Sequence, residues 1–351
     1  MSPQRLGPSR TQEFRTRLLA WFETSARDLP WRRTRDPYAI WVSEIMLQQT
    51  RVAAVLEHYT RFLDRFPTLI SLALAQEEEV LALWSGLGYY RRARMLHRAA
   101  QFVAAECKGA LPRTAAELRK LPGVGDYTSA AIASIAFGEA VAVVDGNVER
   151  VVTRIAGLLP EDEKPGQIAV ARIRRITDNL LDPAHPADFN QAMMELGATV
   201  CLPRKPLCLQ CPVRALCSTR GEHSAQAAKQ MRSVQVAYAL VERETPRMGL
   251  EVILEQRPPS EAIMPGMWEL PPVEPDDHLH PSRKVLSVRH SITQTNYYAT
   301  ITRYSPEEFD HLARRHGARR WVAASKLASL PLTGLARKVL KRLAILPALK
   351  L

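Results

Sequence analysis

Two carboxyl groups stand in sequence neighbourhoods that suit acid and base chemistry. Glu44 lies in a run of large apolar residues over 41–47, and a carboxyl among such side chains can keep its proton. Asp145 follows a short apolar run and precedes a helix predicted over 148–158. The structural alternatives are that Glu44 joins Gln48 and Arg51 in a solvated helical stripe and that Asp145 only caps the helix. Periodicity alone favours the stripe.

Four cysteines form a second group that can do chemistry. They are separated by six, two and five residues, and prolines stiffen the intervening loops. Thiols this close in the chain indicate a metal site. Spacing alone leaves zinc and a 4Fe-4S cluster open, although zinc sites usually show two short Cys-x-x-Cys pairs and only one is present. The candidate ligands are Cys201, Cys208, Cys211 and Cys217.

A glycine turn between two predicted helices offers a site for an anion. Thr114 and Glu117 form a capping box for the first helix, and the second is expected over 128–137. Gly123 and Gly125 in the turn permit positive φ and the close approach of a phosphate, which the free N–H groups of the second helix favour. A turn that merely packs two helices fits the same residues.

The composition bounds the class of protein. A chain of 351 residues with 46% hydrophobic residues suggests two domains with buried cores. Forty-eight Lys and Arg against thirty-six acidic residues give a net charge of +12, which suits a polyanionic partner. No apolar run approaches the roughly 20 residues of a membrane span, and the N-terminus lacks a signal-type core. We therefore expect no membrane association and a cytoplasmic location, at the nucleoid if the source is bacterial.

Periodic patterns divide the chain into an all-α and an α+β part. A first helix is expected over 11–22, and a long helix over 39–66 carries Glu44. Strand-like segments begin only after a polar stretch. The expected division is an all-α domain over 1–221, a linker over 222–232 and an α+β domain over 233–351, with strands at 233–242, 251–256 and 285–304 and a helix at 305–316.

These motifs together resemble the helix-hairpin-helix DNA glycosylases of the endonuclease III superfamily. The resemblance rests on Leu-Pro-Gly-Val-Gly at 121–125 and Val-Asp-Gly-Asn-Val at 144–148. Glycosylase/lyase members carry a lysine at the position of Tyr127, and its amine forms a Schiff base with the sugar. A chain with tyrosine there and with Asp145 resembles the monofunctional, MutY-type adenine DNA glycosylases.

The resemblance implies a hydrolase that removes adenine mispaired with 8-oxoguanine or guanine from double-stranded DNA. Glu44 would protonate the adenine, Asp145 would stabilise positive charge on the sugar, Tyr127 would orient both carboxyls and Asn147 would support Asp145. The cysteine spacing implies a 4Fe-4S cluster, and a monomer is expected. The residues implied to contact the base or DNA are Arg27, Trp31, Gln48, Gln49, Tyr89, Gly123, Gly125 and Gln191.

Several of these positions have a structural alternative. Trp31 would line the pocket of the flipped adenine or plug the core, and Gln191 would face the adenine edge or solvent. Gln49 would wedge into the DNA stack. Tyr89 would probe the damaged guanine, although a tyrosine beside a glycine turn also serves as an ordinary core residue.

The resemblance extends to the C-terminal part, which in MutY-type enzymes is Nudix-like. The stretch 264–271 looks like the family's, but the Nudix catalytic helix is absent, so this part is expected to recognise a lesion without hydrolysing nucleotides. The family's 8-oxoguanine loop reads Phe-Ser-His, whereas this chain has His290, Ser291 and Ile292. Only the serine is retained.

Two other functions fit parts of this sequence. An endonuclease III-like lyase needs the amine that Tyr127 replaces, and borohydride trapping of an enzyme–DNA adduct would reveal it. A non-catalytic DNA-structure binder needs no paired carboxyls, so it predicts that Glu44→Gln leaves DNA transactions intact.

Overall fold

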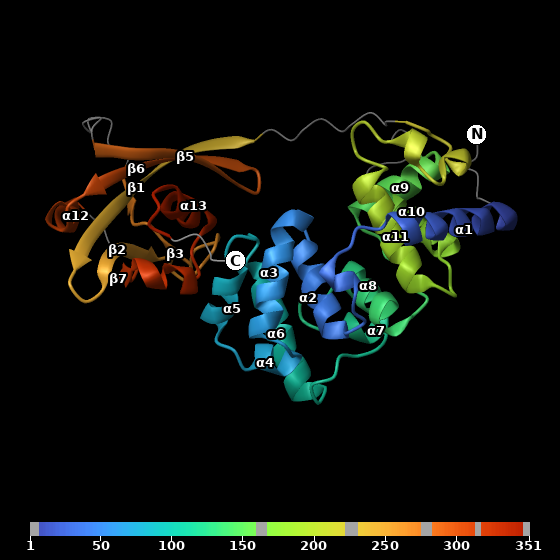
Figure 1. Ribbon diagram of the computed structural model, residues 1–351, viewed down its shortest axis with the longest axis horizontal. Coiled ribbons are helices and arrows are strands. Elements are labelled where there is room, and N and C mark those ends of the chain that lie inside the picture. The colour runs from blue at the N-terminus through green and yellow to red at the C-terminus, as the bar shows by residue number, and fades with distance from the viewer. Residues whose placement is uncertain (1–6, 159–166, 222–230, 275–282, 313–316, 347–351) are drawn as a thin grey trace. The chain divides into compact units, whose positions relative to one another are not determined.

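The computed structural model describes residues 7–158, 167–221, 231–274, 283–312 and 317–346 (Figure 1). The chain divides into two compact units, Met1–Ala73 with Arg98–Ala227 and Leu74–His97 with Ala228–Leu351. Residues 74–97, which the sequence pattern assigned to the first domain, thus group with the C-terminal part. Most of the expected linker, residues 222–230, lies outside the described residues.

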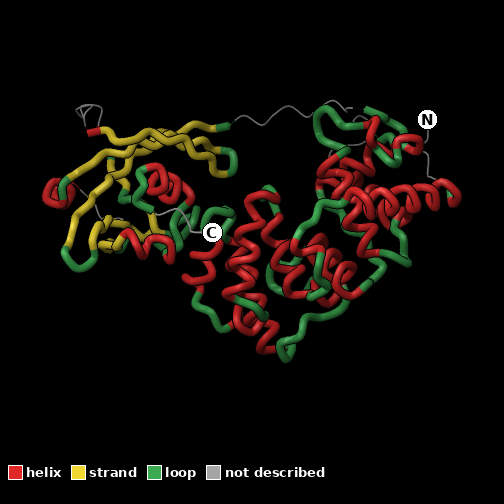
Figure 2. Tube along the Cα trace, viewed as in Figure 1, coloured by secondary structure: helices red, strands yellow, loops and turns green. Residues whose placement is uncertain are grey.

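The first unit is all-α, as expected (Figure 2). Its core contains Phe14 and Leu18 of the first helix, which pack against Phe189, with the two phenylalanine ring centroids 6.3 Å apart. No helix among the described residues has the length and apolarity that crossing a bilayer requires. The helices are α1 Pro8–Ser25, α2 Pro37–Leu47, α3 Val52–Arg65, α4 Leu69–Ala73, α6 Arg91–Glu106 (which spans both units), α7 Ala115–Leu118, α8 Asp126–Phe137, α9 Gly146–Ala156, α10 Gln167–Leu180 and α11 Pro186–Thr199.

The single long helix expected over 39–66 is wrong. The chain leaves helical geometry at Gln48, takes a left-handed conformation at Gln49 with φ of 56°, and restarts as α3 behind Arg51. The proposed polar stripe of Glu44, Gln48 and Arg51 therefore does not exist. Helical periodicity missed the break because α2 and α3 each continue an apolar pattern on either side of it.

The second unit is built on a mixed sheet, which confirms the α+β class. In the described residues seven strands form it, with the order β3-β2-β1-β6-β5; β4 pairs with β1 and β7 with β2. Strands β1 and β6 run parallel, and the other pairs run antiparallel. The strands are β1 Arg232–Thr245, β2 Gly249–Gln256, β3 Trp268–Glu269, β4 Pro272–Val273, β5 Lys284–Ile292, β6 Thr295–Tyr304 and β7 Arg319–Ala323.

Side chains alternate between the two faces of this sheet. Leu240 joins the core under α13 (Gly334–Arg342), whereas its neighbour Val241 packs with Phe309 of α12 (Pro306–Leu312). The segment expected as one strand over 285–304 is a hairpin of β5 and β6, because the chain reverses at Thr293, where φ is 52°. The capping box of α12 is confirmed by reciprocal bonds between Ser305 and Glu308.

Residues 74–97 attach to the sheet through hydrogen bonds. The hydroxyls of Ser85 and Tyr90 donate to the Leu332 carbonyl at 3.0 and 3.1 Å, and the Arg94 guanidinium donates to the Pro265 carbonyl at 2.6 Å. The unit contains α5 Glu77–Trp84 from this segment and the 3₁₀ helix η6 Ala324–Ser329.

Candidate active site and cysteine centre

Glu44 lies on the buried face of α2. Its side chain is 4% exposed and accepts a short hydrogen bond from the Tyr127 hydroxyl. Burial raises the pKa of Glu44 to about 7, and the charge of Asp145 adds to the rise, while the Tyr127 hydrogen bond and the charge of Arg32 oppose it. This environment matches the sequence-based expectation of a carboxyl that keeps its proton near neutral pH.

Tyr127 stands in the first turn of α8 and is half-buried. Burial raises the pKa of its hydroxyl well above the ordinary value, so this group remains a donor. Its oxygen also lies 3.6 Å from the Met194 sulfur. Tyr127 therefore orients Glu44, but among the described residues no hydrogen bond joins it to Asp145, so the role of orienting both carboxyls is not visible.

Asp145 caps α9 and is held by two donors. One carboxylate oxygen accepts from the Val148 N–H at 2.7 Å, and the other accepts from the Asn147 amide at 2.9 Å. Both donors stabilise negative charge at the start of a helix, where the dipole adds to the effect. Because α9 begins at Gly146 rather than at 148 as expected, Asp145 is the N-cap and a charge near Glu44 at once.

A chain of hydrogen bonds continues from Asn147 to the cysteine loop. The Arg150 guanidinium donates to the Asn147 side-chain oxygen at 2.9 Å, to the Gly197 carbonyl at 2.7 Å and to the Cys201 carbonyl at 2.8 Å. A Cβ at Gly197 would lie 2.6 Å from that of Asn147, so only glycine lets the two backbones come this close. Sequence reasoning missed Arg150, although its spacing of three from Asn147 on a helix was available.

A buried carboxylate on α11 organises the loop before α2. Glu195 accepts a bidentate bond from Arg27, with both distances at 2.7 Å, and a third bond from Arg32 at 2.7 Å. Burial by itself would raise the pKa of Glu195, but the two guanidinium groups lower it to about 2. The sequence predicts Arg27 as a contact of the base or DNA but gives no sign of Glu195, because the ion pairs of Glu195 span more than 160 residues.

A cavity of about 920 Å³ lies beside this ion cluster. Arg27, Arg32 and Gln191 line it together with residues of α1. Gln191 is only 8% exposed, so the solvent-facing alternative is wrong. Among the described lining residues neither Glu44 nor Asp145 is found. Trp31 does not line the cavity either; it is buried and packs edge-on against Tyr59 with centroids 5.4 Å apart.

The two residues expected to wedge into DNA share an unusual backbone. Gln49 and Tyr89 have φ of 56° and 49°, a left-handed conformation that costs energy for residues other than glycine. Both are exposed, and the Tyr89 side chain is 46% accessible. Gln48, by contrast, is held by a hydrogen bond to Thr128 at 3.1 Å.

The glycine turn has the expected helices on both sides. Gly123 takes φ of 74°, which confirms the need for glycine there. Gly125 is extended, with φ of −97°, so the expectation of positive φ at this position is wrong. A Cβ on Gly125 would meet nothing within 4 Å, so the space in front of α8 is open.

The C-terminal loop residues are largely engaged within the hairpin. The Ser291 hydroxyl bonds the Asn296 side-chain oxygen at 2.6 Å, and Arg289 donates to the same oxygen at 3.2 Å. The His290 ring packs against the backbone of Gly334, and burial and Lys338 lower the pKa of His290. Ile292 is half-buried at the end of β5.

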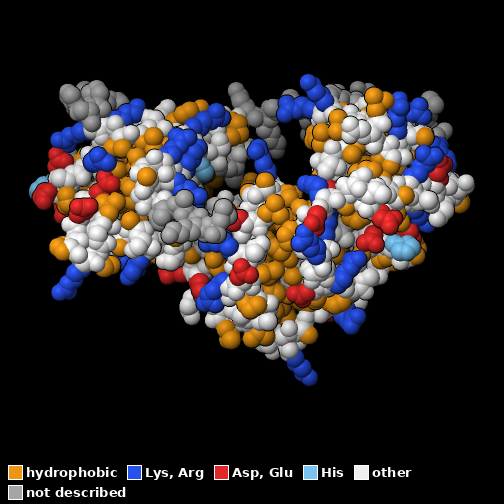
Figure 3. Space-filling view, in the orientation of Figure 1, with side chains coloured by type: hydrophobic (Ala, Val, Ile, Leu, Met, Phe, Trp, Pro, Cys, Tyr) orange, Lys and Arg blue, Asp and Glu red, His pale blue; other side chains and the backbone are white. Residues whose placement is uncertain are grey.

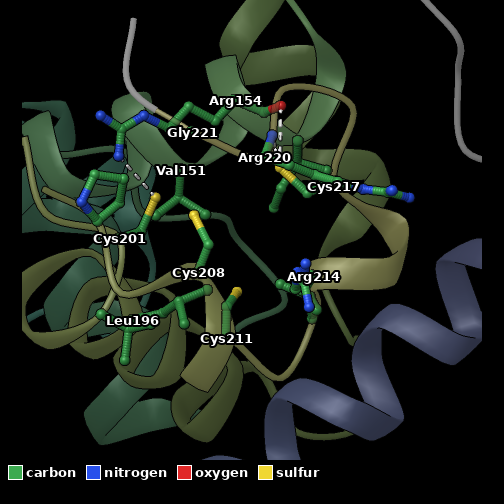
Figure 4. Close-up of a pocket in the computed structure, with 14 residues that line it drawn as sticks. Val151, Arg154, Leu196, Cys201, Cys208, Cys211, Arg214, Cys217, Arg220 and Gly221 are labelled. Carbon is green, nitrogen blue, oxygen red and sulfur yellow. Dashed lines mark hydrogen bonds between the residues drawn. The ribbon is translucent and has the colours of Figure 1, made fainter.

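The four cysteines surround one small cavity of about 30 Å³ (Figure 4). In the part of the chain that is described, no three His, Cys, Asp or Glu side chains converge closely enough to chelate a single ion. Four cysteine side chains around one cavity are a donor set that suits a thiolate-bound metal centre.

Cationic and N–H groups approach these sulfurs. Buried Arg154 donates to the Cys201 sulfur at 3.3 Å and to the Leu202 carbonyl at 2.7 Å, and the Arg220 N–H donates to the Cys217 sulfur at 3.5 Å. Burial, with the neighbouring thiols, raises the pKa of Cys211 to about 11.

Comparison with known proteins places the chain in a family. Residues 42–180 match the model of the HhH-GPD superfamily base excision DNA repair protein. A thermostable thymine-DNA glycosylase is 33% identical in structure-based alignment, with a TM-score of 0.55 over 60% of this chain and 96% of that one. The chain belongs to the HhH-GPD superfamily. The matched region holds Glu44, Tyr127 and Asp145 in one fold.

Within the superfamily, adenine DNA glycosylases are similar to this chain. The human enzyme is 52% identical over 217 residues, which cover 59% of this chain and 39% of the human one. The mouse enzyme is 41% identical over 323 residues, covering 76% and 62%. The chain thus spans less than two thirds of the length of these curated relatives.

Proposed function

We propose that the protein is a monofunctional adenine DNA glycosylase that hydrolyses the N-glycosidic bond of adenine mispaired with 8-oxoguanine or guanine in duplex DNA. The observation that carries the proposal is the pair of carboxyls in opposite environments: Glu44, buried and hydrogen-bonded to Tyr127, beside Asp145, capped by N–H donors. Adenine glycosylases among the relatives support the choice of base.

The carboxyl pair divides the reaction between two groups. Protonated Glu44 gives its proton to N7 of adenine, so the base leaves with the electron pair of the C1′–N9 bond. The Asp145 carboxylate stabilises the positive charge that develops on the sugar, and water then completes the hydrolysis at C1′. Tyr127 supplies no amine, so no Schiff base forms and the strand is not cleaved.

The DNA-contacting roles remain those implied by the resemblance. Gln49 and Tyr89, both exposed on left-handed backbone, would enter the stack, and the open space before Gly125 would take a phosphate. Lys and Arg side chains are distributed over the visible faces of both units (Figure 3). We assign residues 1–221 to catalysis, 222–232 to the linker and 233–351 to lesion recognition, with the protein acting as a monomer.

The cysteine centre would hold a 4Fe-4S cluster through Cys201, Cys208, Cys211 and Cys217. The cluster's positive iron ions would supply the charge that thiolate ligands need. The cluster would have a structural role and hold this loop in a rigid shape. Three cationic residues of the loop would then contact DNA phosphates: Arg204, Lys205 and Arg214, which are exposed.

Single-turnover release of adenine from duplexes with adenine opposite 8-oxoguanine or guanine tests the function. Release by the wild type and its loss in Glu44→Gln are expected. A borohydride-trapped adduct would indicate a lyase instead. Tight duplex binding without release by either protein would indicate a non-catalytic DNA binder.

A further inference from the structure

The turn that carries Tyr89 has positive φ at three residues, and it is strained at Tyr89, the one that is not glycine. Gly86, Gly88 and Tyr89 all have positive φ, at 115°, 73° and 49°. For tyrosine this backbone persists only when neighbouring groups fix it. The ring of Tyr89 nevertheless stays exposed, so core packing does not fix it.

The Arg92 side chain contacts this turn at several points and can stabilise its conformation. Its guanidinium carbon lies 5.5 Å from the ring centroid of Trp84 and 5.4 Å from that of Tyr89. The same guanidinium donates to the carbonyls of Leu87 and Gly88 at 3.4 and 3.2 Å. One cation therefore contacts two rings and two backbone carbonyls of the turn.

The surrounding groups show that Arg92 is part of the fold rather than a free surface cation. Trp84 is fully buried, and its indole N–H also donates to the Gly88 carbonyl at 3.2 Å. Burial lowers the pKa of Arg92 to about 10, so its guanidinium remains charged at neutral pH. Its neighbour Arg91, by contrast, is exposed at the start of α6.

We propose that Arg92 is a positioning residue that holds the Tyr89 ring in one pose, so that the enzyme distinguishes the base opposite its target adenine. The inference rests on the proposed function, because Tyr89 is there the residue that probes this base. In this proposal Arg92 acts through Tyr89, whose ring it contacts, and not by a contact of its own with base or phosphate.

The decisive readout is the ratio of single-turnover adenine release opposite 8-oxoguanine to that opposite guanine. Arg92→Met keeps the stem but removes both cation–π contacts and both carbonyl bonds, and we expect the ratio to fall on the order of tenfold. Arg92→Lys keeps the positive charge but lacks the planar guanidinium, so its ratio should lie between those of the wild type and Arg92→Met. In a protein that already carries Tyr89→Ala, adding Arg92→Met should not change this ratio further.

Arg91→Met is the matched control. If Arg91 meets a phosphate, its loss weakens binding of both duplexes equally and lowers the salt dependence, leaving the ratio unchanged. The proposal is overturned if Arg92→Met behaves in the same way, or if its effect adds fully to that of Tyr89→Ala.

Hydrogen exchange of the DNA-free protein separates the proposal from the function on which it rests. Amides of residues 86–90 should exchange at least several-fold faster in Arg92→Met than in Arg91→Met. If the wild type ignores the opposite base, the lesion-reading part of the proposed function fails, while exchange still reports on Arg92. Equal exchange in the two variants refutes the positioning role in either case.

Discussion

Replacing Glu44 by glutamine separates catalysis from stability. The amide has nearly the shape of the protonated carboxyl, can accept the Tyr127 hydrogen bond and carries no charge at any pH. It cannot deliver a proton, so adenine release should be lost at every pH. In the wild type, release should fall as pH rises through about 7, because Glu44 then loses the proton that it must donate.

The raised pKa of Glu44 also sets the magnitude of the stability effect. Between pH 4.5 and about 7 the folded protein holds a proton that the unfolded chain has released, so the free energy of unfolding falls as pH rises through this window. The difference between the two pKa values corresponds to about 3 kcal/mol. Glu44→Gln escapes this loss and should become more stable than the wild type, by up to about 3 kcal/mol at pH 8.

Urea unfolding at pH values from 4.5 to 8 measures this difference directly. Titrating groups that do not interact with Glu44 contribute equally to both proteins and cancel in the comparison. Glu57→Gln, which removes an exposed carboxyl on α3, serves as the control and should track the wild type at all pH values. If the advantage of Glu44→Gln over the wild type is the same at pH 4.5 and pH 8, the raised pKa is wrong and so is the assignment of Glu44 as a proton donor at neutral pH.

Three further substitutions test the framework around the carboxyl pair. Gly197→Ala should lower the free energy of unfolding by about 1–3 kcal/mol and slow adenine release, because the new methyl overlaps Asn147. Arg150→Met should slow single-turnover release on the order of a hundredfold without loss of the absorbance of the proposed 4Fe-4S cluster, because it loosens the support of Asn147. Glu195→Gln should lower the free energy of unfolding in urea by about 1–3 kcal/mol, because it removes the buried counter-charge of Arg32, whose side chain is 14% exposed, and of the more exposed Arg27.

Each of these three expectations has a result that would contradict it. Gly125→Ala meets no atom within 4 Å and should leave stability unchanged, so an equal loss in Gly125→Ala and Gly197→Ala would argue against the steric explanation. Wild-type release by Arg150→Met would show that Asn147 holds Asp145 unaided. A stability loss below about 1 kcal/mol in Glu195→Gln would mean that solvent screens the cluster.

Local sequence patterns were sufficient to predict much of the candidate site. An apolar neighbourhood correctly marked Glu44 as a buried acid, a capping position marked Asp145, and spacing brought the four cysteines to one cavity. The periodicity of apolar residues also predicted the structural classes of the two parts, all-α for the N-terminal part and α+β for the C-terminal part. Each of these features depends on residues that lie close together in the chain, where local geometry limits how far apart they can be.

Other features are set by contacts between distant segments, and only the tertiary structure decided them. The break at Gln48–Gln49, the extended backbone at Gly125 and the burial of Gln191 all departed from local expectation. The partners of Glu195 and the route from Cys201 through Arg150 to Asn147 join residues 50 or more positions apart. Sequence thus determined which side chains can do the chemistry, whereas tertiary packing decided which of them are held, paired or free, because desolvation and ion pairing depend on neighbours that periodicity does not encode.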